Sequence, residues 1–298
     1  MRVLITGIGG FVGSRLARHL LERGDRVSGT YINTRPAVAG ADLYAADLLD
    51  PAALEEVIRA ADPDAIVNLA GLAHVGESWD SKLIPDYYWV NVVGTENLLV
   101  AAAGRRVVIA SSADVYGMVP REEQPISEHR RIAPQTPYAL TKAASERLAV
   151  AHDAVIARSF NLLGPGQAAK FSLAGWAAKL AEIRRGERQA VLEAGNLSTW
   201  RDFVHVDDGA EAYRVLAEKG ERGTVYNLAT GRAVQMRDAL NRLREISGVD
   251  AEVKEGVYPA RPYDIPYLAG DASRLRALGW EPRRTLDDAL RDLWDTVR

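Results

Sequence analysis

The first half of the chain alternates short apolar runs with amphipathic segments, and this alternation constrains the fold more than any other feature. The apolar runs are rich in Val, Ile and Leu, as expected for strands that are buried on both faces. Strands that take turns with helices form a parallel sheet covered on both sides. We therefore predict an α/β fold with a doubly wound parallel sheet. The expected strands are Arg2–Thr6, Asp25–Thr30, Ala65–Leu69, Arg106–Ser111 and Ala154–Ala157, and the expected helices are Phe11–Arg23, Pro51–Ala60, Asp86–Ala103 and Tyr138–Ala151.

The alternation loosens after about residue 160, where Gly164, Pro165 and Gly166 interrupt it. We expect a first domain over residues 1–160, to which parts of 203–232 return, and a smaller substrate-binding domain over residues 161–298. The elements expected in the second half are helices at Leu173–Arg185, Val206–Lys219, Gln235–Ser247 and from Thr285 onward, with a strand at Thr224–Leu228.

A glycine-rich turn, TGIGGFVGS at residues 6–14, joins the first expected strand to the first expected helix. Gly7 permits a tight turn, Gly10 lets backbone N–H groups approach a pyrophosphate, and Gly13 lets helix and strand pack closely. The helix N-terminus then faces the negative charge. A plain structural turn is the alternative, but the strand–turn–helix context favours a Rossmann-type dinucleotide-binding domain.

The end of the second strand bears on the choice of dinucleotide. An acidic residue there binds the ribose hydroxyls of NAD, but this chain has residues 30–35, TYINTR, with no acid. Arg35 is suited to pair with a 2′-phosphate, although it is equally compatible with a solvated loop. The cofactor is therefore NADP(H) or NAD(H), with NADP(H) favoured. Asp47 either accepts a hydrogen bond from the adenine amino group or caps a turn.

Tyr138 and Lys142 lie in the sequence YALTK on an expected helix, so their side chains share one face about 5–6 Å apart. A free phenol, with a pKa of about 10, is a poor acid–base catalyst at neutral pH, and a neighbouring ammonium lowers that pKa. Ser112 lies at the carboxyl end of a central strand, where open α/β sheets bind ligands. An amphipathic helix and a serine-rich loop are the alternatives, but the order of the three residues favours a catalytic site.

Charge and composition exclude several other classes of function. The net charge is -3, which gives no electrostatic reason to expect nucleic acid or an anionic membrane as a partner. The absence of cysteine excludes thiolate chemistry and fits a reducing compartment. We expect a cytoplasmic protein without a leader or a membrane span, and no metal site, since the five histidines form no ligand pattern.

These motifs together resemble the extended short-chain dehydrogenase/reductase family, in its NAD-dependent epimerase/dehydratase group. The resemblance covers essentially the whole chain and rests on TGIGGFVG (6–13), DL (47–48), NLAG (68–71), VNVVGT (90–95), SSADVYG (111–117), YALTK (138–142) and RDFVHVDD (201–208). It implies that Ser112, Tyr138 and Lys142 form the catalytic triad. The cofactor-binding residues that it implies, beyond Arg35 and this Tyr–Lys pair, are Gly7, Gly10, Phe11, Val12, Gly13, Asp47, Leu48, Leu69, Ala70, Asn91 and Ser111.

A narrower resemblance lies in residues 158–167, 195–203 and 260–282, which are similar to GDP-4-keto-6-deoxy-D-mannose reductases. It implies that a GDP-sugar is the substrate and that Arg201 and Arg261 meet its diphosphate, as guanidinium groups suit phosphate oxygens. Asn161 would lie near the pyrophosphate, and Lys179 either near the base or on a solvated helix face. For the two arginines the alternative is a surface ion pair.

The leading hypothesis is therefore an enzyme that reduces the C4 keto group of a nucleotide-activated sugar. A 4-epimerase or 4,6-dehydratase that recycles its cofactor is the second hypothesis, because Asp114 occupies the position of an acid–base residue in the dehydratases. Ala113 breaks the acidic pair of one dehydratase group. A non-catalytic dinucleotide-sensing protein is the third hypothesis, and the presence of both Tyr138 and Lys142 argues against it.

The family resemblance also predicts a homodimer that forms through two helices from each subunit. The helices expected at Asp86–Ala103 and Tyr138–Ala151 carry apolar side chains that either pack in a four-helix interface or only face the sheet. These side chains are Tyr87, Val90, Leu98, Leu99, Leu140, Leu148 and Val150.

Overall fold

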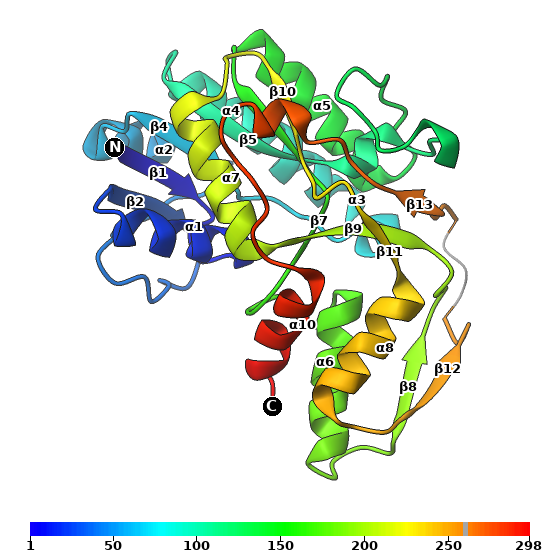
Figure 1. The fold of residues 1–298 in the computed structure, drawn as a ribbon. Coiled ribbons are helices and arrows are strands. Elements are labelled where there is room, and N and C mark those ends of the chain that lie inside the picture. The colour runs from blue at the N-terminus through cyan, green and yellow to red at the C-terminus, as the bar shows by residue number, and fades with distance from the viewer. Residues whose placement is uncertain (259–261) are drawn as a thin grey trace.

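The computed structural model describes residues 1–258 and 262–298, and its centre is a parallel sheet of seven strands (Figure 1). The strand order is β10-β6-β5-β4-β1-β2-β3, so the chain reverses its direction of winding between β1 and β4. This order confirms the predicted doubly wound α/β class. The strands are β1 (Arg2–Thr6), β2 (Arg26–Tyr31), β3 (Asp42–Ala45), β4 (Ala65–Asn68), β5 (Arg106–Ser112), β6 (Val155–Ser159) and β10 (Val225–Leu228).

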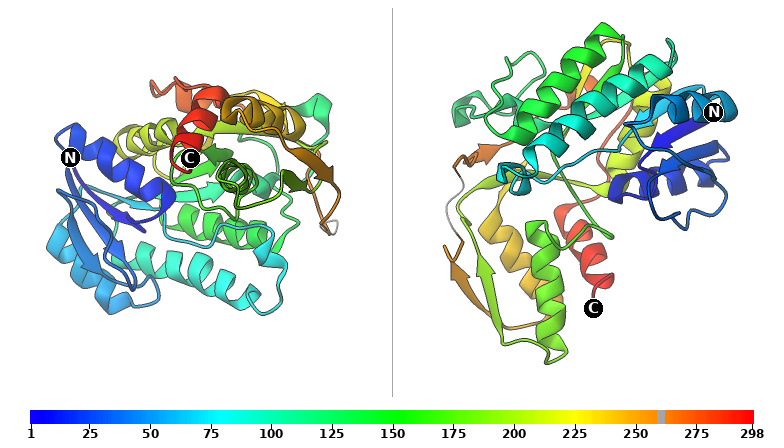
Figure 2. Two further views of the ribbon diagram at one scale, coloured as in Figure 1. Left: turned by 90° about the horizontal axis from the view of Figure 1, so that it is seen from below. Right: turned by 180° about the vertical axis from the view of Figure 1, so that it is seen from behind.

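Helices cover both faces of this sheet (Figures 1 and 2). Helices α1 (Phe11–Glu22) and α7 (Val206–Lys219) pack on one face, where Leu16, Leu20 and Leu216 are fully buried. The opposite face is covered by α2 (Pro51–Ala61), α4 (Gly94–Ala101) and α5 (Pro137–Ala151). The strands are therefore buried on both sides, which explains why their sequences barely alternate.

Local sequence fixes where several helices begin. The Asp50 side chain accepts a hydrogen bond from the backbone N–H of Ala53, which caps α2. Thr136 caps α5 in the same way and is followed by Pro137 in the first turn. These caps set the start of α5, and so the position of Tyr138 in its first turn.

The helix expected at Asp86–Ala103 is irregular. It consists of α3 (Ile84–Tyr88), a π-helical turn η2 (Trp89–Val93) and α4. The extra residue of a π turn rotates the side chains that follow it, and such turns occur often at functional sites. Tyr87, Leu98 and Leu99 face inward and are buried, whereas Trp89 and Val100 are more than half exposed.

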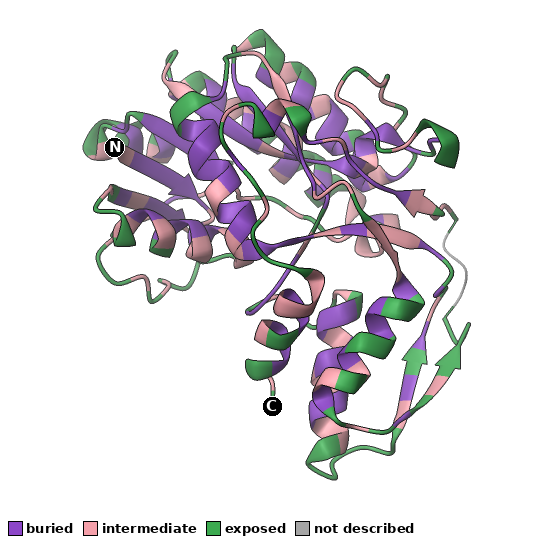
Figure 3. Cartoon of the chain, viewed as in Figure 1, coloured by how far each residue is buried: buried purple, intermediate pink, exposed green. Residues whose placement is uncertain are grey.

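A second, smaller core lies beside the main sheet and is built on α6 (Ser172–Arg184), α8 (Met236–Ser247) and α10 (Leu286–Asp295) (Figure 3). Leu180, Leu240 and Leu290 are fully buried in it. The sequence predicted these helices but missed the short strands around them. These are β7 (Asn161–Leu163), β8 (Val191–Ala194), β9 (Trp200–His205), β11 (Ala233–Gln235), β12 (Glu252–Glu255) and β13 (Tyr267–Leu268).

The remaining elements are short connections. They are the 3-10 turns η1 (Glu77–Trp79), η3 (Ala113–Tyr116) and η4 (Arg121–Glu123), and the helix α9 (Ser273–Arg276). Within the residues that the structure describes, no helix has both the length and the apolar character needed to cross a membrane.

Gly13 packs closely against the backbone of the glycine turn, and this contact gives a test of the fold. A Cβ atom at Gly13 would lie 2.3 Å from the Gly7 carbonyl oxygen, whereas one at Gly10 would lie 3.1 Å from the same oxygen. We expect Gly13→Ala to lower the thermal midpoint of unfolding clearly, because backbone must move, and Gly10→Ala to lower it less. Differential scanning calorimetry of both variants checks the order. The reverse order would contradict this account of the β1–α1 junction.

Candidate active site

The glycine turn lies at the point where the sheet reverses its winding. Gly7 has φ +67, and a Cβ there would lie 3.0 Å from the backbone N and Cα of Ala70, the residue that follows Leu69 beyond β4. The turns after β1 and β4 therefore approach each other closely. Helix α1 begins directly after the glycine turn, with Phe11 and Val12 as its first residues. Carboxyl ends of strands at such a switch point are where open α/β sheets bind dinucleotides.

The segment after β2 reaches back over the same turn. A Cβ at Gly9 would lie 2.9 Å from Cβ of Pro36, so Arg35 is held next to the glycine turn. The Arg35 side chain is exposed. On the other side, Leu48 packs against Gly94, where a Cβ would lie 2.8 Å from the Leu48 Cβ. The Leu48 carbonyl accepts a hydrogen bond from the Asn97 side chain at 3.0 Å. The Asp47 side chain accepts from the backbone N–H of Leu49 at 2.9 Å, so it does cap its own turn.

Asn91 connects three parts of the site from within the π turn. Its side-chain oxygen accepts from the Leu72 N–H at 2.8 Å, and its side-chain nitrogen donates to the Leu72 carbonyl and to the Thr141 hydroxyl, both at 3.0 Å. The Ser145 hydroxyl donates to the Asn91 carbonyl at 2.7 Å. Asn91 is 1% exposed, so it holds the loop after β4 against α5 from inside the protein.

Ser112, Tyr138 and Lys142 meet where β5 ends against α5. Tyr138 and Lys142 share one face of α5, and the Lys142 ammonium lies 6.0 Å from the centre of the Tyr138 ring. The Tyr138 hydroxyl is hydrogen-bonded to Ser112. The Lys142 ammonium donates to the Ala110 carbonyl at 2.9 Å. All three side chains are buried.

Burial dominates the ionisation of this group. It raises the pKa of Tyr138 well above that of a free phenol, and the Asp114 carboxylate raises it further, while the hydrogen bond with Ser112 has the opposite effect. Burial also lowers the pKa of Lys142 to about 8, against the attraction of the Glu146 carboxylate. The sequence predicted that Lys142 would lower the pKa of Tyr138. Here the ammonium donates to the Ala110 carbonyl and burial has the larger effect on the pKa of Tyr138, which therefore holds its proton at neutral pH.

Asp114 follows Ser112 in the turn η3 and lies near two phenols. Its backbone N–H donates to the Ser112 hydroxyl at 3.2 Å. Its negative charge raises the pKa of both Tyr138 and Tyr263. A carboxylate therefore lies close enough to affect the phenol of the Ser112–Tyr138–Lys142 group.

The expected substrate residues lie on the elements of the second core. Arg201 on β9 forms an ion pair with Asp264 at 3.0 Å and donates to the Ile265 carbonyl at 2.7 Å. Lys179 on α6 donates to the Tyr258 hydroxyl at 3.2 Å and lies 3.6 Å from the Glu193 carboxylate.

The other two expected substrate residues are Asn161 and Arg261. Asn161 is exposed at the start of β7. Arg261 lies outside the described residues.

One group with the composition of a metal site is present in the described parts of the chain: His205, Asp207 and Asp292 have ligand atoms within 4.8 Å of one another. The His205 Nδ1 accepts the Asp207 N–H at 3.0 Å, and its Nε2 lies 3.2 Å from Asp292. Arg284 lies 3.2 Å from the Asp292 carboxylate and 3.4 Å from that of Asp207. Since a metal would have to displace this arginine, we interpret the group as an ion-pair cluster.

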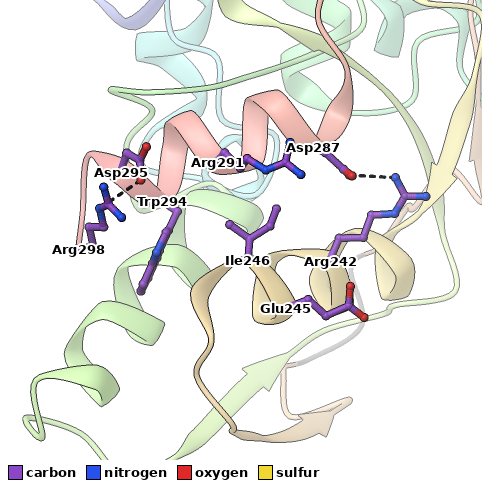
Figure 4. A pocket seen from close by; sticks show the side chains of 8 residues that line it. All are labelled: Arg242, Glu245, Ile246, Asp287, Arg291, Trp294, Asp295 and Arg298. Carbon is purple, nitrogen blue, oxygen red and sulfur yellow. Dashed lines mark hydrogen bonds and ion pairs between the residues drawn. The ribbon is translucent and has the colours of Figure 1, made fainter.

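A hollow of about 490 Å³ lies between α8 and α10 (Figure 4), and none of the residues that line it belongs to the Ser112–Tyr138–Lys142 group. Arginines line it, but Arg242 is paired with Asp287 at 3.1 Å and Arg298 with Asp295 at 3.1 Å. Because these charges are already neutralised within the protein, the hollow does not have the character of an anion site. We do not assign it to the substrate.

Sequence reasoning missed two buried charged residues next to the triad, Glu146 on α5 and Arg158 on β6. They form an ion pair at 2.6 Å in which both side chains are buried. A signal was available, because an arginine inside the apolar run Val155–Ser159 requires a partner when it is buried.

A doubly wound sheet with a glycine turn at its switch point, and a Tyr–Lys pair packed on the adjacent strand end, defines a dinucleotide-dependent enzyme of the short-chain dehydrogenase/reductase type. The model of the family described as GDP-mannose 4,6 dehydratase matches residues 4–293. The chain belongs to this family, within the extended short-chain dehydrogenases/reductases.

Similar proteins include both reductases and epimerases. The GDP-6-deoxy-D-mannose reductase of Pseudomonas aeruginosa is 32% identical over 301 residues, which cover 97% of this chain and 95% of the relative. The structure of RMD from Pseudomonas aeruginosa complexed with NADPH has a TM-score of 0.85 and 30% identity, covering 99% of this chain and 98% of the other. The UDP-glucose 4-epimerase of Thermotoga maritima with UDP-glucose has a TM-score of 0.89 and 25% identity, covering 99% and 98%.

The lowered pKa of Lys142 has a consequence for stability. In the unfolded chain the ammonium keeps its proton up to its ordinary pKa of 10.5, so between pH 8 and 10.5 the unfolded state binds more protons than the folded state. Wild-type stability therefore gains from this group as the pH rises through that window, and the buried charge is a cost below it. We expect Lys142→Met to be more stable than wild type at pH 7, by on the order of 3 kcal/mol.

This difference should shrink as the pH approaches 10.5, and urea unfolding at pH 7 and pH 9.5 measures it. Lys179→Met is the matched control, because Lys179 is partly exposed and no such gain is expected. Equal stability of wild type and Lys142→Met at pH 7 would contradict the prediction.

Proposed function

We propose that this protein reduces the C4 keto group of a nucleotide-activated 4-keto-6-deoxy sugar, most specifically GDP-4-keto-6-deoxy-D-mannose, with NADPH. The observation that carries the proposal is the buried Tyr138 hydroxyl. It is hydrogen-bonded to Ser112 and holds its proton at neutral pH, which is the state that a proton donor requires. The similarity to GDP-6-deoxy-D-mannose reductase along nearly the whole chain supports the choice of substrate.

The described residues fit a dinucleotide. Gly7 and Gly10 add no side chain to the turn after β1, and a Cβ at Gly7 would meet the backbone of Ala70. Backbone N–H groups at the start of α1 are thus open to a pyrophosphate. Asp47, Leu48 and Leu69 border the same edge of the sheet, where we place the adenosine.

In this mechanism bound NADPH supplies the hydride that reduces C4. The Ser112 hydroxyl donates a hydrogen bond to the carbonyl oxygen and orients it toward Tyr138. The Tyr138 hydroxyl gives its proton to that oxygen as negative charge develops there, which leaves a phenolate that is reprotonated from water. The positive charge of Lys142, on the same face of α5, stabilises the phenolate.

Binding of the nucleotide diphosphate falls to arginines in this proposal. Arg201 is held by Asp264 near the start of β9, and Arg261 is the second arginine that we expect to bind the diphosphate. We expect Asn161 to lie near the pyrophosphate and Lys179 near the base. We expect these contacts to exist in both the ground state and the transition state, so their loss should raise KM more than it lowers kcat.

A cofactor-recycling epimerase or dehydratase is the second candidate function, and Asp114 favours it. The carboxylate lies close enough to affect Tyr138 and is chemically able to move a proton on the sugar. The likeness to UDP-glucose 4-epimerase supports the same alternative. Both alternatives return the hydride to the sugar, so they consume no cofactor.

Stoichiometry separates the two. The purified protein is given GDP-4-keto-6-deoxy-D-mannose and NADPH, and the NADPH oxidised is counted against the 6-deoxyhexose formed. A ratio near one is expected for the reductase. Conversion of GDP-mannose or UDP-glucose with no net change in nicotinamide absorbance would overturn the proposal in favour of a dehydratase or an epimerase.

Tyr138→Phe tests the proton donor. Removal of the hydroxyl should lower kcat by about 100-fold or more while cofactor binding is kept, because general acid catalysis contributes on this scale. Tyr226→Phe on β10 is the control, since it removes another buried phenol that only accepts a hydrogen bond from the Glu221 N–H. Near-native kcat in Tyr138→Phe would exclude this mechanism.

Arg35→Ala tests the preference for NADPH. The variant should bind NADPH about tenfold more weakly, since it loses a charge-assisted contact with the 2′-phosphate, and should bind NADH as wild type does. Fluorescence titration with both dinucleotides measures this. Arg18→Ala, which changes an exposed arginine farther along α1, should leave both affinities unchanged. An equal effect on NADH and NADPH would remove Arg35 from the 2′-phosphate site.

We also propose a homodimer that forms through the outer faces of α4 and α5. Of the side chains considered for this interface, Leu140 and Val150 are exposed, whereas Tyr87, Leu98 and Leu99 are buried against their own chain and are left out of the proposed interface. The sequence missed further exposed apolar side chains on the π turn and α4, which are Trp89, Val93 and Val100.

Val100→Asp should therefore dissociate the dimer, because it places a charge within the apolar surface of α4. Multi-angle light scattering at micromolar concentration measures the mass. Val257→Asp changes an exposed valine on another surface and should leave the mass unchanged. A wild-type protein that is monomeric in this experiment would refute the dimer.

A further inference from the structure

A buried ion pair lies directly behind the candidate catalytic group. The Glu146 carboxylate accepts two hydrogen bonds from the Arg158 guanidinium, from Nε at 2.9 Å and from a terminal nitrogen at 2.6 Å. It also accepts the Ser111 hydroxyl at 2.5 Å. Glu146 and Arg158 are 4% and 5% exposed, and the guanidinium stacks 4.7 Å from the Tyr116 ring.

These contacts join the end of β5 to α5 residue by residue. Ala110 accepts the Lys142 ammonium, Ser111 donates to Glu146, and Ser112 is bonded to Tyr138. Three consecutive residues of the strand are thus held by helix residues spaced four apart, which lie on one face of α5. Arg158 is the register partner of Ser111 on β6, so it anchors the middle contact from the next strand.

Stability alone is a weak explanation for this pair. Taking two charges out of water costs about as much as their attraction returns, and apolar residues of similar volume often stabilise a protein equally well. A bidentate Arg–carboxylate pair does fix geometry, because the planar guanidinium allows few orientations. The pair contacts Ser111, which lies in the strand between the Lys142 partner Ala110 and Ser112. A fixed geometry at Ser111 therefore also fixes its two neighbours.

We propose that Glu146 is a positioning residue for Ser112, Tyr138 and Lys142: held by Arg158, it locks the end of β5 against α5 and supplies a negative charge that attracts the Lys142 ammonium. This inference rests on the proposed function, since it concerns the same site. Glu146 itself touches no reacting atom.

The ionisable groups that interact with Lys142, Tyr138 or Arg158 come from several elements. Tyr138 and Glu146 lie on α5, Asp114 and Tyr116 on η3, and Arg158 on β6. Tyr87 on α3 and Tyr213 on α7 also face Tyr138. Among the causes that shift the pKa of Lys142, burial lowers it and Glu146 opposes that effect. Removing the Glu146 charge should therefore lower the pKa of Lys142 further.

Glu146→Gln tests the proposal, because it removes the charge and keeps the shape. We expect kcat to fall about tenfold or more with the KM for the sugar within threefold. The alkaline limb of the kcat profile should move to lower pH by about one unit, since Lys142 loses its proton earlier. The matched control is Glu211→Gln on α7, which breaks a bidentate pair with Arg214 at 2.7 and 2.8 Å outside the site. It should leave both readouts unchanged.

Ser111→Ala keeps the test decisive if Glu146→Gln does not fold, because it removes the middle contact and leaves the ion pair intact. We expect it to fold, to lower kcat several-fold, and to leave the alkaline limb in place, since the charge is kept. Wild-type kcat in folded Glu146→Gln or in folded Ser111→Ala would overturn the proposal. So would an alkaline limb in folded Glu146→Gln at the wild-type pH.

The binding of NADPH separates this inference from the proposed function. If wild type reduces no 4-keto sugar, the proposed function fails, but the pH dependence of NADPH affinity can still be measured by fluorescence titration. As the pH is raised, NADPH binding weakens when Lys142 loses its proton. Positioning by Glu146 predicts that this weakening begins at a lower pH in Glu146→Gln than in wild type. An unchanged pH dependence would overturn the inference whatever the reaction is.

Discussion

The parallel arrangement of the main sheet determines where everything else in this protein lies. Because all seven strands point the same way, the turns after β1, β4 and β5 meet at one edge. At this edge the backbones of Gly7 and Ala70 approach so closely that a Cβ at Gly7 would lie 3.0 Å from Ala70. The glycine turn, Ser112 and the first two turns of α5 are neighbours in space for the same reason, although they are distant in sequence.

The candidate active site at this edge of the sheet is maintained at an energetic cost. Lys142 is buried, and burial lowers its pKa to about 8, while Glu146 and Arg158 lie unhydrated beside it. Each charge is stabilised by a specific partner: the Ala110 carbonyl for the lysine, and the bidentate pair for the other two. Such a cost in folding stability is expected where charged groups must be held in a fixed geometry away from water for a reaction.

Sequence periodicity predicted the main sheet well and the second core less well. Strands buried on both faces give continuous apolar runs, so Arg2–Thr6 and Ala65–Asn68 were recognisable with little error. β8, β12 and β13 are two to four residues long and gain their stability from pairing across long sequence separations. A pattern within a few neighbouring residues of the sequence cannot predict such long-range strand pairing. The π turn at Trp89–Val93 was missed for a related reason, since it depends on the contacts of Asn91 with the loop after β4 and with α5.

The candidate triad was found from spacing and order alone, because Tyr138 and Lys142 are four residues apart on one helix. The direction of the lysine was not predictable from spacing. It depends on the Ala110 carbonyl, which belongs to a strand more than thirty residues earlier in the chain. Glu146 and Arg158 were overlooked because a helical Glu and a strand Arg are ordinary until their burial is known.

The path of the chain between the two cores has a consequence for how the protein holds together. After β6 the chain leaves the main sheet, returns with α7 and β10, leaves again, and returns with Leu275 and Trp280 before it ends in α10. Neither core is a contiguous piece of sequence. A chain cut after residue 160 would expose the apolar face of α1 that α7 covers and would turn β6 into an open edge strand. The two halves therefore depend on each other for folding, and any movement between them has to bend several crossing segments together.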